Sequence, residues 1–274
     1  MVLESLINPL KAEREPWEMF FIGMVYSSIA VLLSLWIFNQ HASLVMVFLT
    51  VMACVPLIYT TIKMEEKKDL ELSDERTLLR EHGKALLFFV FLFLGIMISL
   101  SLWYVFLPND VTSTLFSIQT QTITDINDRV TGNATQDFNM FVAIFLNNIK
   151  VMVFCILFAF LYGAGAIFIL TWNASVISVA IGNFIRTNIG TTSSYFQIGS
   201  LGILRYMVHG IPEITAYFVA GLAGGIISVA VIRHDFGTTK FERILLDSTN
   251  LLVISLVMLF IAALAEVYIT PILF

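Results

Sequence analysis

Charged residues and cysteines are both scarce in this chain of 274 residues. Asp, Glu, Lys and Arg make up 13% of it against 58% hydrophobic residues, which is too little polar surface for an ordinary soluble domain. The net charge of -5 and the lack of a sustained basic patch argue against nucleic acid as a partner. Cys54 and Cys155 both fall inside apolar runs, which indicates neither a disulfide framework nor a metal site.

Sequence motifs of enzymes are missing as well. The chain has no His-Glu-x-x-His pair for zinc, no Gly-x-Ser-x-Gly elbow and no phosphate-binding loop. The first apolar run is too long for a cleavable signal peptide and lacks a small-residue cleavage pattern, so we interpret it as a retained span. We therefore expect no cofactor, no metal and no enzymatic activity.

Long apolar runs are the main feature that the chain does have. A helix needs about 20 mostly apolar residues to cross the hydrocarbon core of a membrane. Six runs meet this length, and a seventh, 174–189, is shorter and contains Asn183 and Arg186, so it is a short span or a re-entrant segment. The sequence thus predicts an all-α, polytopic helical membrane protein with about seven spans in one domain, 1–274. The six long runs are 19–38, 44–62, 85–107, 151–171, 214–232 and 251–270.

The positions of Lys and Arg between the spans predict the orientation in the cell membrane. The leader, 1–18, and the connection 63–84, which contains six Lys and Arg residues, should be cytoplasmic. The connection 108–140 has Arg129 alone and should be a largely solvated outer loop, in which Asn133-Ala-Thr135 is a possible glycosylation site. With seven spans the carboxyl terminus lies outside. The four tryptophans are predicted to mark span ends: Trp17, Trp36, Trp103 and Trp172.

The cytoplasmic connection is predicted to be helical in its second half, with Ser73 as a cap and Gly83 as a stop. Its mixed charges are typical of a solvated helix face, and the alternative is a docking surface for a cytoplasmic partner.

The stretch Val208-His-Gly-Ile-Pro-Glu213 contains ionisable groups beside a long apolar run. Such groups are costly in a membrane, so each is a candidate for function. Arg205, His209 and Glu213 are spaced four apart, although Gly210 and Pro212 favour a span that begins near Pro212. We expect His209 and Glu213 to pair. The cluster then either has a purely structural role or binds a partner, a lipid headgroup or an ion. Catalysis is the weakest alternative.

Amides and glycines form two further groups of candidates. Asn147, Asn148 and Asn173 should lie at the ends of the fourth span, where they either bond exposed backbone groups or line a polar pathway. Glu266, in the last span, should pair between helices or be neutralised. The glycines of the apolar runs let helix backbones approach closely, and we assign them to helix packing: Gly163, Gly165, Gly221, Gly224 and Gly225.

These features together resemble the stage II sporulation protein M family. The resemblance is carried by Asn147-Asn148, the glycine-bearing span, Asn173, and His209-Gly210 with Glu213 before a Gly-rich span. It is strongest over a core at 147–233, and the opening stretch, 8–17, is similar to archaeal members. Val208 and Ala174 stand where the family usually has proline and glycine, respectively.

The resemblance implies a non-enzymatic membrane scaffold, which in bacterial sporulation recruits cell-wall hydrolases during engulfment. Our leading hypothesis is therefore a multi-pass protein that organises protein partners, which can include further copies of itself, within the lipid bilayer. The alternative is a permease-like or channel subunit whose polar residues line a pathway. An intramembrane hydrolase is the third hypothesis.

Overall fold

The computed structural model describes residues 15–71, 75–124, 137–188, 195–232 and 237–273, and every regular element within these ranges is helical. Seven of the described helices are long and apolar enough to cross a membrane, which confirms the all-α class and the number of spans. These helices are α3 (Glu18–Ile37), α4 (Ala42–Glu71), α5 (Glu75–Phe106), α8 (Asp137–Tyr162), α9 (Ala166–Asn188), α10 (Tyr195–Ile232) and α11 (Thr239–Leu264).

Shorter elements connect or end the long helices. A 3-10 turn, η1 (Asn39–His41), joins α3 to α4, and α6 (Asn109–Leu115) follows α5. After α11 the chain continues through a π-helical turn, η2 (Ala265–Ile269), into α12 (Thr270–Leu273). The helix α11 itself begins where the Thr238 hydroxyl accepts a hydrogen bond from the Phe241 amide, 3.2 Å away.

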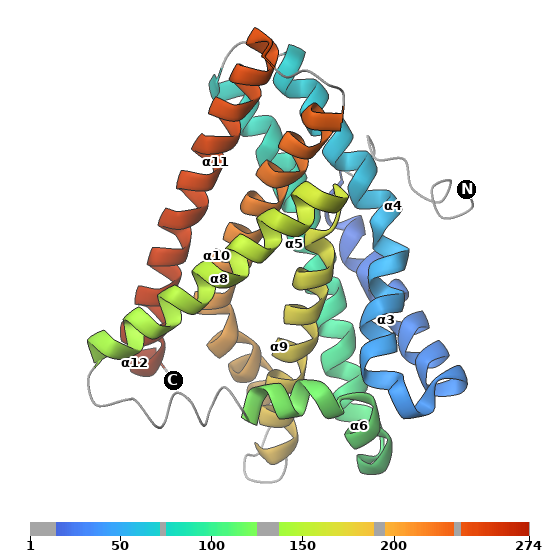
Figure 1. Ribbon diagram of the computed structural model, residues 1–274. Helices are drawn as coiled ribbons and strands as arrows, with labels where there is room; N and C mark the ends of the chain where they lie inside the picture. Colours follow the sequence, from blue (N-terminus) through green and yellow to red (C-terminus); the bar gives the residue numbers. More distant parts are fainter. Residues whose placement is uncertain (1–14, 72–74, 125–136, 189–194, 233–236, 274) are drawn as a thin grey trace.

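The long helices form two groups that share a centre. One group packs α3 and α9 along α5, and the other packs α8 and α11 along α10. Figure 1 shows α3 and α4 on one side of the molecule and α11 on the other, with α5, α9 and α10 between them. The central α10 is the most enclosed span, because 83% of its most apolar stretch is buried against at most 61% in any other.

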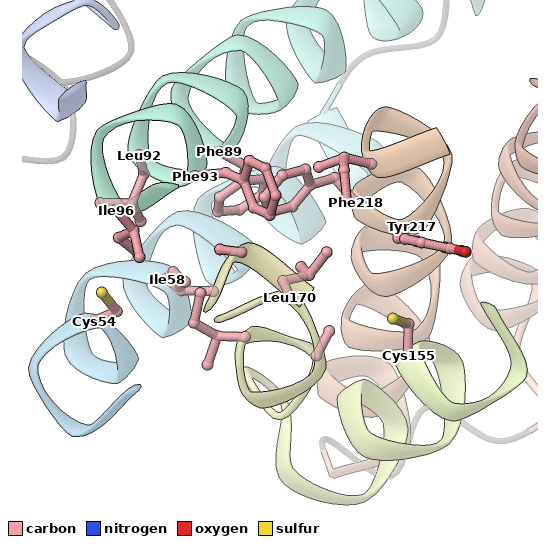
Figure 2. Close-up of a cluster of buried hydrophobic side chains, with 14 of the residues drawn as sticks. Cys54, Ile58, Phe89, Leu92, Phe93, Ile96, Cys155, Leu170, Tyr217 and Phe218 are labelled. Atoms are coloured by element: carbon pink, nitrogen blue, oxygen red, sulfur yellow. The ribbon is translucent and has the colours of Figure 1, made fainter. Parts of the chain in front are cut away.

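Aromatic side chains join the two groups. The Phe89 ring of α5 stacks on the Phe218 ring of α10, with centroids 5.4 Å apart. Figure 2 shows these rings together with Ile58 and Leu170 from α4 and α9, and shows Tyr217 on the opposite side of α10. This contact holds the candidate residues of α10 in a fixed place between the two halves.

Glycines set the closest helix contact. A Cβ atom on Gly23 of α3 would collide with the backbone of α5, and one on Gly95 of α5 would collide with the Phe20 carbonyl of α3. Packing of this kind replaces the hydrophobic effect as the force between helices in lipid. The sequence analysis did not single out either glycine.

The prediction of one span over 151–171 is wrong. The chain turns at 163–165, where α8 ends and α9 begins. Gly163 has a φ of +68°, a left-handed conformation that residues with a Cβ rarely adopt. The uncertain segment 174–189 is therefore the second part of a full-length helix that begins at Ala166, and Trp172 lies inside that helix rather than at a span end.

Two other predicted boundaries are also wrong. The helix α10 begins at Tyr195 and continues through Pro212, so that residue does not start the span. Proline inside a helix removes one backbone hydrogen bond, which neighbouring helices make tolerable in a membrane protein. Gly83 lies inside α5 and does not stop a helix, because the connection 63–84 is the joined ends of two long helices.

The first part of the predicted outer loop is packed rather than solvated. Residues 109–115 and 117–124 are helical, and Leu115, Phe116 and Gln119 are fully buried. The Gln119 amide oxygen accepts from the Ser43 hydroxyl at 2.6 Å, and its nitrogen donates to the Ser175 hydroxyl at 3.3 Å. This side chain therefore fastens the segment to α4 and α9. The predicted glycosylation site at Asn133 lies outside the described residues.

Candidate functional site

One face of α10 carries the ionisable candidates. Because α10 is continuous, Arg205, His209 and Glu213 occupy successive turns on the same side of a single helix. The Arg205 side chain is outside the described part of the structure. His209 and Glu213 are both half-buried.

Each of these two side chains has a hydrogen-bond partner. Nδ1 of His209 lies 3.2 Å from the hydroxyl of Thr270, the first residue of α12. The Tyr217 hydroxyl, one turn further along α10, donates to a carboxyl oxygen of Glu213 at 2.8 Å. Hydrogen bonds are thus available to both groups within the protein, which is how a membrane interior tolerates polar side chains.

A second carboxyl group approaches from the other side of the interface. Glu266 belongs to the π-helical turn η2, and it interacts electrostatically with Glu213 and Tyr217. Turns of π-helix inside α-helices are frequent at functional sites, because the extra residue changes the direction of the side chains. From the sequence, Arg186 or Arg205 could be the partner of Glu266. Arg186 instead donates to the Val105 and Leu107 carbonyls at the end of α5.

The structure separates the three asparagine candidates. Asn147 is exposed on α8, whereas its neighbour Asn148 is buried, and the amide nitrogen of Asn148 has no hydrogen-bond partner in the described part of the chain. Asn173 lies within α9 and donates to the Ile169 carbonyl of the same helix at 2.8 Å. Asn148 is on the face of α8 that packs against α10, since Ile156 on the same face meets Gly224.

The candidate glycines lie at helix contacts around this site. A Cβ atom on Gly224 would lie 2.8 Å from the Ile156 carbonyl oxygen, and one on Gly221 would lie 2.8 Å from Cβ of Ala166. A Cβ on Gly225 would meet the Ile62 side chain at 3.0 Å, and one on Gly165 would collide with the Phe158 carbonyl. Gly210, in contrast, has open space where a Cβ would be, and it lines an apolar pocket between α5 and α10 with Phe93, Met97 and others.

A second ionic cluster, which sequence reasoning missed, lies where α4 and α5 are joined. Glu65 is fully buried and His82 is 2% exposed, and Nδ1 of His82 lies 2.7 Å from a Glu65 carboxyl oxygen. The Lys68 ammonium donates to the other Glu65 oxygen at 2.6 Å and approaches Glu81 within 3.5 Å. The charges of this connection are thus not simply a solvated face.

No signal in the sequence marks the pair. Glu65 and His82 are seventeen positions apart, and the contact depends on how α4 turns back into α5. Among the described residues, no three His, Cys, Asp or Glu side chains are grouped so that they could hold a metal ion. The two cysteines are free and buried, as expected from their place in apolar runs.

Comparison with known proteins assigns the family. The family model of stage II sporulation protein M matches residues 85–271, which is more than half of the chain and includes α8, α9, α10 and Glu266, but not the Glu65–His82 cluster. An uncharacterized protein of Methanocaldococcus jannaschii is 28% identical over 176 residues, which cover 60% of this chain and 94% of that protein. No solved structure matches the chain. The chain belongs to the stage II sporulation protein M family.

Proposed function

We propose that the protein is a non-enzymatic component of the cell membrane that organises protein partners through a cytoplasmic projection. The helices α4 and α5 have 30 and 32 residues, about ten more than a membrane crossing requires. Their joined ends therefore project beyond the hydrocarbon core. Membership of a family named for a sporulation protein is consistent with a role in a membrane assembly.

The observation that carries the proposal is the buried Glu65–His82–Lys68 cluster inside this projection. Buried, hydrogen-bonded charges fix the geometry of the helices that hold them. On the outside of the same projection, Lys63, Lys67 and Arg80 are exposed. These exposed cations on a rigid projection are well suited to bind an acidic protein surface, because complementary charge speeds association and selects the partner.

The test is purification of the full-length protein from native membranes in mild detergent, with identification of what accompanies it. The variant Lys67→Glu/Arg80→Glu reverses the exposed charge, and Asp110→Lys reverses an exposed charge on α6, outside the projection. We expect a stoichiometric partner with the wild type and with Asp110→Lys, and its loss with the double variant at an unchanged elution volume. Equal partner recovery with the double variant would overturn the proposal.

A second candidate function is favoured by the two carboxyl groups within the spans. Glu213 of α10 and Glu266 of η2 interact electrostatically, and paired acids inside a membrane often mark a path for ions or protons. In that case the protein is a permease-like component of a transport system. Glu213→Gln should then abolish solute flux, whereas unchanged flux combined with lost partner binding in the projection variant favours the organising role.

A further inference from the structure

The interface between α10 and the segment formed by η2 and α12 brings two acidic side chains, Glu213 and Glu266, to about the same height along the packed helices. His209 of α10 and Thr270 of α12 are in contact at 3.2 Å. Figure 1 shows that α10 and α11 meet at one end of the molecule, so these neighbouring helices run in opposite directions. One turn away from the His209–Thr270 contact, Glu213 on one side therefore lies opposite Glu266 on the other, in agreement with their electrostatic interaction.

The described groups around this pair supply hydrogen bonds and little compensating charge. From α10 they are His209 and Tyr217, and from α8 they include Cys155, which lies beside Tyr217 in Figure 2. His209 is the member of this set that can become a cation, and it lies at the Thr270 end. Two carboxylates in a low-dielectric interior repel each other, so at least one must be neutralised.

An unpartnered amide points to a ligand at the same level. Asn148 is 5% exposed, and its side-chain nitrogen has no hydrogen-bond partner in the described part of the chain. The register of α8 on α10 follows from Ser255, whose hydroxyl contacts Met152 and the Ala216 carbonyl. Asn148 precedes Met152 by one turn.

Glu213 likewise precedes Ala216 by about one turn, and α8 and α10 run in the same direction, because a later contact joins Ile156 to Gly224. Asn148 thus lies on the face of α8 that packs on α10, one turn before Met152, as Glu213 lies about one turn before Ala216. Buried donors in native proteins are almost always hydrogen-bonded, so one without a protein partner calls for a water or another ligand oxygen.

We propose that Glu213 and Glu266 form a binding site for one monovalent cation, H⁺ or Na⁺, with the Asn148 amide holding an oxygen atom beside it. A single positive charge suffices to relieve the repulsion of two carboxylates. The inference goes beyond the organising role proposed above, and it does not require that any solute be moved.

The first experiment measures the midpoint of thermal unfolding of the purified full-length protein in lipid nanodiscs. At alkaline pH, Na⁺ is titrated against choline, and in a second series the pH is lowered without Na⁺. We expect the wild-type midpoint to rise and saturate in at least one series, since a ligand that binds only the folded state stabilises it. A response to Na⁺ identifies a sodium site, and a response to pH alone identifies a proton site.

Matched variants connect this response to the two carboxyl groups. Glu266→Gln removes one charge at nearly constant volume, so it should lose the response and be more stable than the wild type at alkaline pH without Na⁺. Asp110→Asn, an exposed acid on α6, should respond as the wild type does. Equal responses of the wild type and Glu266→Gln, or no wild-type response in either series, would overturn the proposal.

A spectroscopic measurement on the wild type tests the proposal even if Glu266→Gln folds poorly. Infrared difference spectra of the wild type, recorded between neutral and alkaline pH and with and without Na⁺, should show a carboxyl group changing its protonation or its cation contact. Its absence in the wild type would also overturn the proposal. Partner recovery with Lys67→Glu/Arg80→Glu reports on the cytoplasmic projection alone, so failure of that proposal and failure of this one are distinguishable.

Discussion

At the scale of the residue, Gly163 determines where the fourth span ends. Its φ of +68° lies in the left-handed region, and a Cβ at this position would meet the Tyr59 ring at 3.3 Å. Because of this turn, only the three residues 163–165 separate the end of α8 at Tyr162 from the start of α9 at Ala166. The position of Asn148 opposite α10 depends on this geometry, because α8 is held at this end by the turn.

Replacing Gly163 by Ala should lower the free energy of unfolding by about 1–2 kcal/mol, the usual cost of a left-handed conformation for a residue with a Cβ. The measurement is the thermal unfolding midpoint in detergent. Gly83→Ala is the control, because Gly83 lies in α5 with open space where a Cβ would be. The free energy of unfolding of Gly83→Ala should rise by up to about 1 kcal/mol, because Ala loses less backbone freedom than Gly when a helix forms. A similar response of both variants would contradict the role assigned to Gly163.

Several residues could not be assigned from the sequence for a physical reason. Gly163 stands in an apolar run that the hydropathy pattern predicts to be one helix. Hydropathy reports how apolar the side chains are and does not report the backbone conformation of a single residue. Glu65 and His82 meet only after two helices fold back on each other. The candidate status of His209 and Glu213 was accessible, because an ionisable group in a span is costly in any fold. Their contacts with Thr270 and Tyr217 needed the structure.

At the scale of the element, the segment 109–124 shows how polar composition can mislead. Its threonines, serines and glutamines are typical of a solvated loop, and this was the prediction. The segment is amphipathic, however, and it buries Leu115 and Phe116 while Gln119 bonds to Ser43 and Ser175. A short helical segment is thereby fixed across the ends of α4 and α9.

Gln119→Ala should remove this attachment. The buried Ser43 hydroxyl would lose its acceptor, which costs about 1–3 kcal/mol, whereas the Ser175 hydroxyl keeps its bond to the Trp172 carbonyl. We expect faster proteolytic cleavage within 109–124 and a lower unfolding midpoint. The matched control is Gln121→Ala, two residues away and exposed, which should leave both quantities unchanged. Equal cleavage of the two variants would show that Gln119 does not hold the segment.

At the scale of the whole molecule, the hydropathy pattern was sufficient to predict the class and the number of spans. Seven long apolar helices are present in the described part of the chain. The boundaries were less accessible, because helices such as α4 and α10 extend well past their apolar stretches. The orientation follows from the basic residues, and it stays a prediction.

Single cysteines test that orientation. Thr77 on α5 and Thr120 in the segment 117–124 are both exposed, and the two native cysteines are buried. In intact cells, a maleimide that cannot cross the membrane should label Thr120→Cys and should label Thr77→Cys only after the cells are opened. The reverse labelling pattern would invert the topology. It would also remove the cytoplasmic location on which the organising role depends.

The glycine contact between α3 and α5 has a consequence for biosynthesis. The ribosome completes Gly23 and the whole of α4 before it makes Gly95, so α3 enters the bilayer before its partner surface exists. Only 33% of the apolar stretch of α3 is buried in the finished protein, and α5 supplies the closest of its contacts. A nascent chain arrested before α5 would therefore leave the first span packed on α4 alone, without its closest partner, and exposed to membrane quality control.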